Sequence, residues 1–255
     1  LFARVLDVPG GMKIQTLHGF CESLLGRFPL EAGLAPHFEV MDERDATEGL
    51  AEAQVRVLGR ARSAGQDTLA TALAGVTGHI NEMEFADLLA DLSSERGRLR
   101  RLFDTHGGTD QLTQAVFSRL DVPADATVED TRRTACADDA FPADDLRRAA
   151  AAMLQGSKTD QKHGEILATW LAAEAPNRTT QFERYITAFF TTTGTIRKTL
   201  IYKEAAALEA DAPDIMADEA RRLETIQARI RAIVTARATS SLLTLAEALL
   251  DAYES

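Results

Sequence analysis

Apolar side chains recur every three or four residues through most of the chain, which is the period of an amphipathic α-helix. One clear stripe consists of Leu112, Val116, Phe117 and Leu120, and another runs from Met216 to Val234 at the same spacing. Alternation typical of a strand is confined to short stretches, whose positions are Lys13–Thr16, His37–Val40 and a hairpin or extended loop at Phe190–Tyr202. The pattern therefore predicts a mainly α fold.

Capping residues and helix breakers divide this helical pattern into segments. In chain order, the predicted helices are Asp42–Arg62, Asp67–Leu73, Asn81 through the tail SERGRLRRLF, Asp110–Leu120, Val128–Cys136, Pro142–Leu154, a helix opening at Thr159 or Asp160, Phe182–Phe189, and one or two long helices from Pro213 onward. In the helix capped by Asn81, the residues expected on the apolar side are Met83, Phe85, Leu88, Leu89 and Leu92.

A polar corner, Thr16-Leu17-His18, separates the predicted N-terminal strand from a helix whose apolar face includes Leu24 and Phe28. Backbone N–H groups at a helix start lack partners within the helix, so such a corner suits phosphate binding. Thr16 offers a hydroxyl, and the ring of His18 can donate a hydrogen bond or stack. The structural alternative, in which Thr16 ends the strand and His18 caps the helix or fills a polar pocket, stays open.

This corner, followed by Gly19-Phe20 and an amphipathic helix, resembles the T-x-H motif of the UvrD/Rep/RecB group of superfamily 1 helicases. The longer run from Gln15, QTLHGFCESLLGRFPLEAGLAPHFEVMDE, resembles the AddA family of helicase–nuclease subunits in its alphaproteobacterial form. Two later runs fit the same family: GSKTDQKHGE from Gly156 and FFTTTGTIRKTLIYK from Phe189. Three runs in this order make the resemblance fairly specific.

The resemblance implies that residues 1–36 are a short α/β remnant of the first RecA-like motor subdomain. Residues 37–255 would then be a helical insertion of the 1B type, which holds DNA backbone beside the motor. The parent would be an ATP-dependent DNA helicase, with or without a nuclease, that acts in double-strand break repair and recombination with an AddB-like partner subunit. We also expect an internal segment of a longer protein, because the chain starts and stops within a helical pattern.

In that family the phosphate loop that binds ATP and Mg²⁺ lies before this segment, and the acidic box lies after it. The chain itself has no G-x-x-x-x-G-K-S/T run. We therefore expect no ATP hydrolysis and no catalytic, cofactor or metal residue in this part. Asp42-Glu43 imitates an acidic box, but Glu39 interrupts the strand before it, so Asp42 is interpreted as a helix cap and a metal-dependent hydrolase stays a minor alternative.

Basic residues give the remaining DNA-binding candidates, because phosphate contacts need Lys or Arg on a stiff, exposed element. Arg197, Lys198 and Lys203 are expected at the tip of the predicted hairpin and join Thr16 and His18 as candidate DNA-binding residues, although a solvated turn explains them equally well. The weaker or alternative candidates are Lys158, Lys162 and His163 at a helix start, and Trp170, Tyr185 and Phe189, whose helical spacing favours the core over base stacking.

Charge limits these candidates, since 255 residues carry a net charge of −11 and DNA-binding proteins present a basic face. Any contact with a duplex end or single strand must come from a local patch, and a non-catalytic helical scaffold that binds proteins is the alternative. Two cysteines, Cys21 and Cys136, and the lack of an apolar run of roughly 20 residues favour a cytoplasmic protein without a membrane partner.

Overall fold

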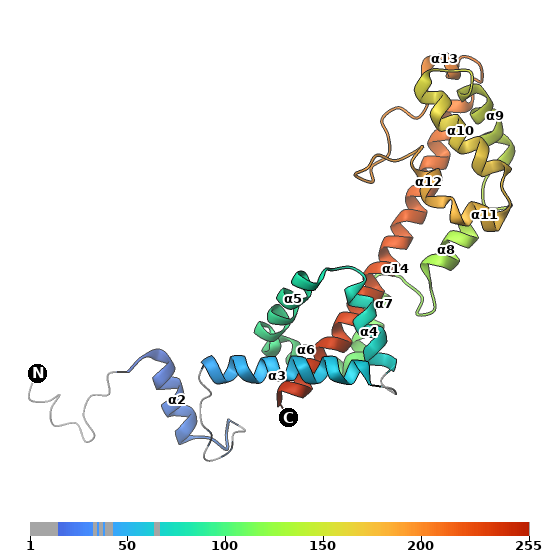
Figure 1. Ribbon diagram of the computed structural model, residues 1–255. Coiled ribbons are helices and arrows are strands. Elements are labelled where there is room, and N and C mark those ends of the chain that lie inside the picture. The colour runs from blue at the N-terminus through green and yellow to red at the C-terminus, as the bar shows by residue number, and fades with distance from the viewer. Residues whose placement is uncertain (1–14, 33–34, 36–37, 39–42, 64–66, 255) are drawn as a thin grey trace, which may run out of the picture. The chain divides into compact units, whose positions relative to one another are not determined.

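The computed structural model describes residues 15–32, 35, 38, 43–63 and 67–254, and these residues are mostly helical (Figure 1). The helices are α2 (Leu17–Arg27), α3 (Glu43–Arg62), α4 (Asp67–Thr77), α5 (Glu82–Ser94), α6 (Arg96–His106), α7 (Thr109–Arg119), α8 (Val128–Ala135), α9 (Ala143–Met153), α10 (Lys158–Ala172), α11 (Ala175–Thr180), α12 (Phe182–Ile186), α13 (Lys203–Ala206) and α14 (Ala212–Glu254). The mainly α prediction is confirmed.

The chain divides into two compact units, residues 1–56 and residues 57–255, which we call the N-terminal unit and the helical unit. Helix α3 crosses the division, so its first part belongs to one unit and its end to the other. The boundary predicted at residue 36 from the resemblance stays a prediction, because several residues around it lie outside the described part of the chain.

The predicted α/β remnant is not confirmed by the part of the N-terminal unit that the structure describes. Lys13 and Ile14 lie outside that part, and Gln15 and Thr16 belong to no strand. Of the predicted strand His37–Val40, only Phe38 is described, and it also lies outside any strand. Within the described ranges, β pairing occurs as a single antiparallel bridge in the later hairpin.

Helix α14 organises the helical unit, because it contacts α4, α5, α6, α7, α8 and α9 along its length. Its 43 residues make it about 65 Å long at 1.5 Å per residue. Most of the predicted stripe from Met216 onward lies on its buried side, as the fully buried Leu223 and Ile233 show, but Val234 at the end of the stripe is 36% exposed. The sequence allowed one or two helices here, and the structure has one.

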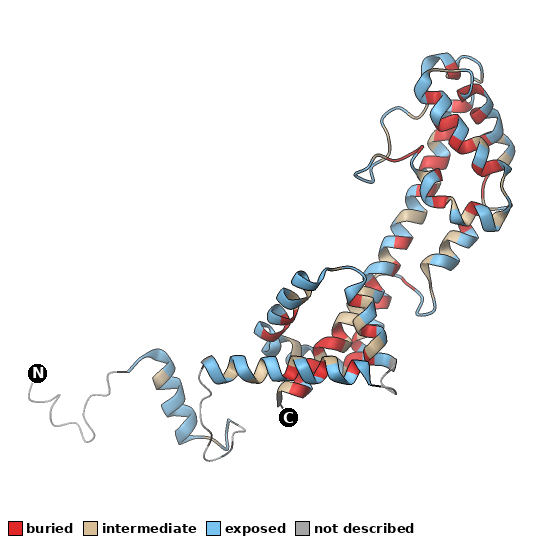
Figure 2. Ribbon diagram, viewed as in Figure 1, coloured by how far each residue is buried: buried red, intermediate tan, exposed pale blue. Residues whose placement is uncertain are grey.

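The main core lies where α9, α10 and α12 pack on the first half of α14 (Figure 2). Four aromatic rings contact one another in series through this core. Between ring centroids, Trp170 lies 4.8 Å from Phe141 and 3.9 Å from Tyr185, and Tyr185 lies 5.3 Å from Phe189; the Trp170–Tyr185 pair is stacked. Trp170, Tyr185 and Phe189 are at most 1% exposed. Their interpretation as core residues is therefore confirmed, and they are not available for base stacking.

The remaining helices, α4 to α7, pack on the second half of α14. Gly75 of α4 approaches so closely that an added Cβ atom would lie 2.3 Å from the Ser241 hydroxyl oxygen, which explains a glycine within a helix. The predicted cap is confirmed, since Asn81 and Glu84 form a reciprocal capping box at the start of α5. Two details of the prediction are wrong: Met83 is 79% exposed, and the helix breaks at Glu95.

Ala212–Tyr253 of α14 is long enough and apolar enough to cross a lipid bilayer, by length and composition alone. The sequence pattern did not indicate such a segment. The central helix of a water-soluble protein passes the same test when its apolar side chains pack inside. Leu245 and Leu249 behave in this way, with 2% and 3% exposure. The cytoplasmic location stays a prediction.

Candidate functional site

The polar corner at the start of α2 is exposed, as a binding role requires. Thr16 is the N-cap residue, and its hydroxyl oxygen accepts a hydrogen bond of 3.1 Å from the Gly19 N–H. The structural alternative weighed from the sequence assigned this capping role to His18. The structure gives it to Thr16 instead. His18 is the second residue of α2, and its exposed ring can donate to an anion at this end of the helix.

Helix α2 buries none of its residues. Apolar side chains along α2 and at its C-cap are open to solvent, with exposures of 76% for Leu17, 52% for Phe20, 48% for Leu24, 38% for Leu25 and 46% for Phe28. Exposed apolar groups that line one side of a helix usually mark a surface that packs on something else. The helix is therefore the part of the chain best suited to contact another protein surface.

The two cysteines should differ sharply in reactivity, which gives a first testable prediction. Cys21 on α2 is exposed, whereas Cys136 is fully buried and burial raises the pKa of its thiol. Because only the thiolate reacts, we expect a disulfide reagent to modify one thiol per native chain and two in urea. A Cys21→Ser chain should react with none before denaturation, and rapid modification of Cys136 in the native chain would contradict the packing described here.

The predicted hairpin between α12 and α13 is present and stiff. Phe190 and Ile196 form an antiparallel bridge, and the Thr191 N–H donates to the Thr195 carbonyl over 2.8 Å. Gly194 turns the chain with a φ of 76°, which glycine adopts without strain. Hydroxyl–hydroxyl bonds join Thr191 to Thr193 and to Thr195 at the tip. The segment beside α14 in Figure 1 can therefore hold donors in fixed positions.

The three cations predicted at the hairpin tip lie after it, because the tip is formed by Thr191–Thr195, and they have different roles. Arg197 is half-buried, and its Nε and Nη2 atoms both donate to the Thr187 carbonyl, at 3.1 and 3.0 Å, so it fastens the hairpin to the end of α12. Lys198 and Lys203 are exposed, and no carboxylate pairs with either among the described residues. Lys203 begins α13, whereas Lys198 lies in the irregular segment between the hairpin and α13.

The structure brings the third candidate group next to the hairpin. Asp160 of α10 is 1% exposed and accepts a hydrogen bond of 3.0 Å from the Tyr202 N–H, which ties the start of α10 to the segment after the hairpin. His163 is buried, and Arg197 and Lys162 act on it electrostatically. Lys162 is exposed, so it adds positive charge to this side of the helical unit, while His163 is interior.

The position of His163 gives a second prediction, on pH. Burial first, and then Arg197 and Lys162, lower the pKa of its ring below the ordinary value of 6.5. The unfolded chain therefore takes up this proton at a higher pH than the folded chain does. Stability should be fully present above about pH 6.5 and should fall as pH drops from there toward the folded-state pKa.

Urea unfolding at pH 7.5 and pH 5.5 measures this effect. We expect a lower midpoint at pH 5.5 for the native sequence and a smaller difference for His163→Gln, since glutamine does not titrate. An equal difference in both chains would exclude His163 as the cause.

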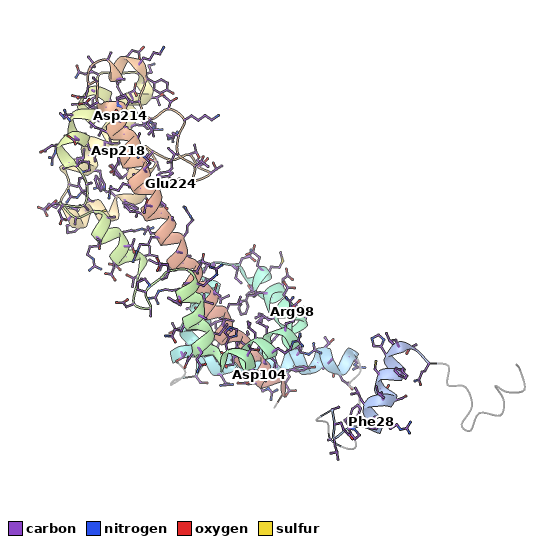
Figure 3. The ribbon with its side chains drawn as sticks, turned by 180° about the vertical axis from the view of Figure 1, so that it is seen from behind. Phe28, Arg98, Asp104, Asp214, Asp218 and Glu224 are labelled. Carbon is purple, nitrogen blue, oxygen red and sulfur yellow. The ribbon has the colours of Figure 1, made fainter. Side chains whose placement is uncertain are left out.

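Sequence reasoning missed Arg231 and Gln227, which line a small pocket with the hairpin. Both lie on α14, where the apolar stripe drew attention to the core instead. A signal was present, because Thr225–Ala246 contains Arg229, Arg231 and Arg237 and no acidic residue. The first half of α14, by contrast, carries Asp214, Asp218 and Glu224 (Figure 3). The middle of α14 is thus a basic stretch in an acidic chain.

We define the hairpin surface as Arg197, Lys198, Lys203 and Arg231. No carboxylate pairs with any of them in the part of the chain that the structure describes. Arginines elsewhere in the helical unit are commonly neutralised by a neighbour three residues away, as in the pairs Arg147–Asp144 and Arg221–Asp218. Other cations, such as Arg119 and Arg229, also lack a carboxylate partner in the described part of the chain. What distinguishes the hairpin surface is that Arg197 and Arg231 line one pocket, where they can attract an anion together.

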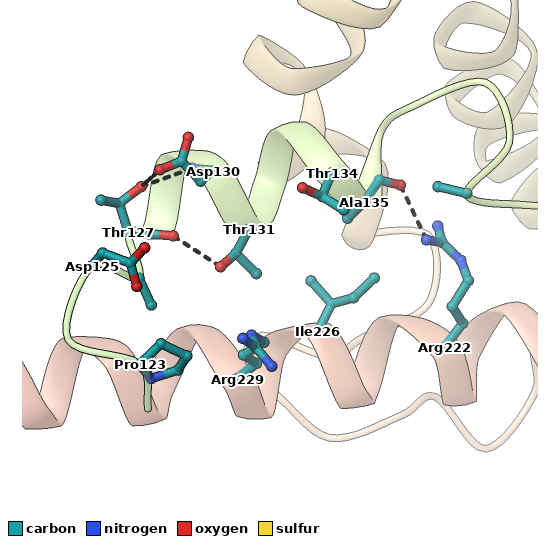
Figure 4. A pocket seen from close by; sticks show the side chains of 12 residues that line it. Pro123, Asp125, Thr127, Asp130, Thr131, Thr134, Ala135, Arg222, Ile226 and Arg229 are labelled. Atoms are coloured by element: carbon teal, nitrogen blue, oxygen red, sulfur yellow. Dashed lines mark hydrogen bonds between the residues drawn. The ribbon is translucent and has the colours of Figure 1, made fainter. Parts of the chain in front are cut away.

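A larger groove of about 710 Å³ lies between α8 and α14. Figure 4 shows its two walls, with Thr127, Thr131 and Thr134 on α8 and Arg222, Ile226 and Arg229 on α14. Arg222 is already bonded to Glu219 and to the Ala135 carbonyl oxygen. Asp125 and Asp130 also line the groove, so its charge is nearly balanced. It suits an anion less well than the hairpin surface does.

No cluster of three or more His, Cys, Asp or Glu residues that could hold a metal ion occurs within the described ranges. Asp42, the acidic-box imitation, lies outside those ranges, as does the side chain of Glu43. The buried carboxylates of Asp160 and Glu219 both accept hydrogen bonds from protein groups.

No protein-family model, curated protein or solved structure matches the chain.

Proposed function

We propose that this chain is a segment of an ATP-dependent DNA helicase–nuclease subunit of the UvrD/Rep/RecB type, which acts in double-strand break repair and recombination. In this proposal the segment contributes contacts to the DNA backbone and no ATP hydrolysis. ATP and Mg²⁺ belong to motor parts outside it, an AddB-like subunit is its protein partner, and the complex works in the cytoplasm. The support for the family is the three sequence runs from Gln15, Gly156 and Phe189.

One observation carries the DNA-contact part of the proposal: Arg197, directly after the hairpin, and Arg231 of α14 line one pocket, and neither has a carboxylate partner among the described residues. Arginine and lysine side chains held in this way bind phosphate oxygens without reading sequence. A backbone contact of this kind suits a subunit that moves along DNA, because it must bind every sequence equally. Thr16 and His18 are a second proposed contact, in the N-terminal unit.

Fluorescence anisotropy of a labelled duplex and a labelled single strand tests the proposal. We expect weak binding at about 50 mM salt that falls steeply by about 200 mM, because binding through phosphates releases counterions. A Thr16→Ala, His18→Ala chain should bind less tightly than the native sequence if the corner takes part. No binding of either DNA at the lower salt would remove DNA contact as a property of this chain.

The second candidate function is a helical scaffold that binds another protein, and it belongs to a different class. Its support is the net charge of −11 together with the exposed apolar side of α2. This function predicts no dependence of DNA binding on the hairpin surface. Charge reversal at Arg197 and Lys198 in the longer parent separates the two functions, since only the DNA-contact proposal expects weaker DNA engagement.

A further inference from the structure

The pocket beside the hairpin has a more specific chemistry than a general basic surface. Its volume is about 250 Å³, and side chains from α12, the hairpin and α14 line it. Arg197 and Arg231 supply cations, Thr192 a hydroxyl and Gln227 an amide, while Phe190 and Ile186 supply an apolar part. We call it the hairpin pocket. Donors from two elements, the hairpin segment and α14, thus line one small space.

Four charged side chains lie at or beside the hairpin pocket, namely Arg197, Arg231, Glu183 and Arg132, and together they carry two positive charges. Glu183 is the carboxylate among its lining residues, and Arg132 of α8, which is outside the lining, forms an ion pair with it. Glu183 therefore does not neutralise either pocket arginine. Arg197 and Arg231 have no carboxylate partner in the described part of the chain. A dianion is the ligand whose charge matches this arrangement.

One donor, Arg197, is positioned before any ligand arrives. Two nitrogens of Arg197 donate to the Thr187 carbonyl, which fixes the plane of its guanidinium group and leaves Nη1 without a protein acceptor among the described residues. The Gln227 amide, the Thr192 hydroxyl and the Arg231 guanidinium also have no hydrogen-bond partner within the described ranges, so they can donate to a ligand. A fixed donor loses little entropy on binding, so it favours a compact anion.

We propose that the hairpin pocket binds a phosphomonoester, which means the terminal phosphate of a nucleic-acid end. The inference rests on the proposed function, because it takes DNA as the partner. A terminal phosphate carries a charge of about −1.5 to −2 at pH 7, whereas each backbone phosphodiester carries only one negative charge. A terminal phosphate is attached to the nucleic-acid chain on one side only, so it can enter a pocket of this size. A phosphate within the backbone is attached on two sides, so the chain would have to leave the pocket in two directions.

Three labelled duplexes of one sequence test the inference: one with 5′-phosphates, one with 3′-phosphates and one with hydroxyl ends. Anisotropy at about 100 mM salt should show tighter binding of one phosphorylated duplex by about tenfold, the effect of one charge-assisted hydrogen bond. The comparison of 5′ and 3′ ends identifies the source of the phosphate. The gain should shrink below about pH 6, where the phosphate takes up its second proton.

Two matched variants locate the effect on one face of α14. Arg231→Gln should abolish the tenfold ratio between phosphorylated and hydroxyl ends. Arg229→Gln removes the same charge from the opposite side of the helix, facing the groove of Figure 4, and should keep the ratio. Unchanged emission of Trp170, the single tryptophan, verifies that both variants fold.

A chain that binds all three duplexes equally overturns the phosphate-end assignment and leaves the proposed function in place. A ratio that survives Arg231→Gln overturns the assignment to this pocket. If none of the duplexes binds, the proposed function fails as well.

Discussion

Replacement of Glu219 by alanine is expected to lower the free energy of unfolding of the helical unit by about 3–5 kcal/mol, the cost of breaking a buried ion pair. The Glu219 side chain is 0% exposed. Arg222 donates to both of its oxygens, over 2.7 Å each, and the Tyr185 hydroxyl donates to Oε1 over 2.8 Å. Without the carboxylate, the mostly buried Arg222 guanidinium loses its ion-pair partner and keeps only the Ala135 carbonyl as an acceptor, and the buried Tyr185 hydroxyl loses its acceptor.

Urea denaturation followed by Trp170 emission measures this loss, because the indole ring stacks on Tyr185 in the same core. Asp218→Ala is the matched control, since Asp218 is the preceding residue and forms an exposed ion pair with Arg221. That pair should contribute less than about 1 kcal/mol. Equal midpoint shifts in the two variants would show that Glu219 does not hold the core together.

The second large effect is expected on DNA affinity. Replacement of Lys198 and Arg231 by glutamine should weaken duplex binding on the order of 50-fold at about 100 mM salt, because each lost phosphate contact lowers the salt exponent by about 0.9. These two cations are chosen because neither has a protein partner in the described part of the chain. Arg197 is less suitable for this purpose, since its bonds to the Thr187 carbonyl support the hairpin itself.

Arg147→Gln combined with Arg221→Gln is the control for net charge. Both arginines are exposed, and both are paired with an aspartate three residues earlier. The control loses the same two charges far along the chain from the hairpin and should keep most of the affinity. If the control weakens binding as much as the hairpin variant does, the effect is one of total charge and no local surface is involved.

Local signals allowed much of the helical unit to be predicted from the sequence. The apolar stripes gave the buried sides of α7, α10 and α14, and Asn81 gave the start of α5, because caps and amphipathic spacing act within a few residues. The run TTTGT indicated the hairpin, which Gly194 permits. The position of Arg231 beside that hairpin could not be predicted, because it depends on how α12 and α14 pack.

The errors have related causes. Met83 fits the helical period of α5 but lies in its first turn, beyond the reach of the neighbouring helices, so it is exposed. The helix breaks at Glu95, two residues before Gly97, which the prediction had placed inside one continuous helix. At Thr16, one hydroxyl performs the capping role, which the sequence alternative assigned to His18. Each error concerns a single position, where local geometry and not the helical repeat of apolar residues decides the outcome.

The most direct test of the central claim is a map of backbone amide chemical shifts by NMR while a short duplex is added at low salt. The account predicts that the largest changes fall on Thr191–Lys198 and on the Gln227–Arg231 turn of α14, and that they disappear at high salt. Changes confined to α4–α7, or no changes at all, would contradict it.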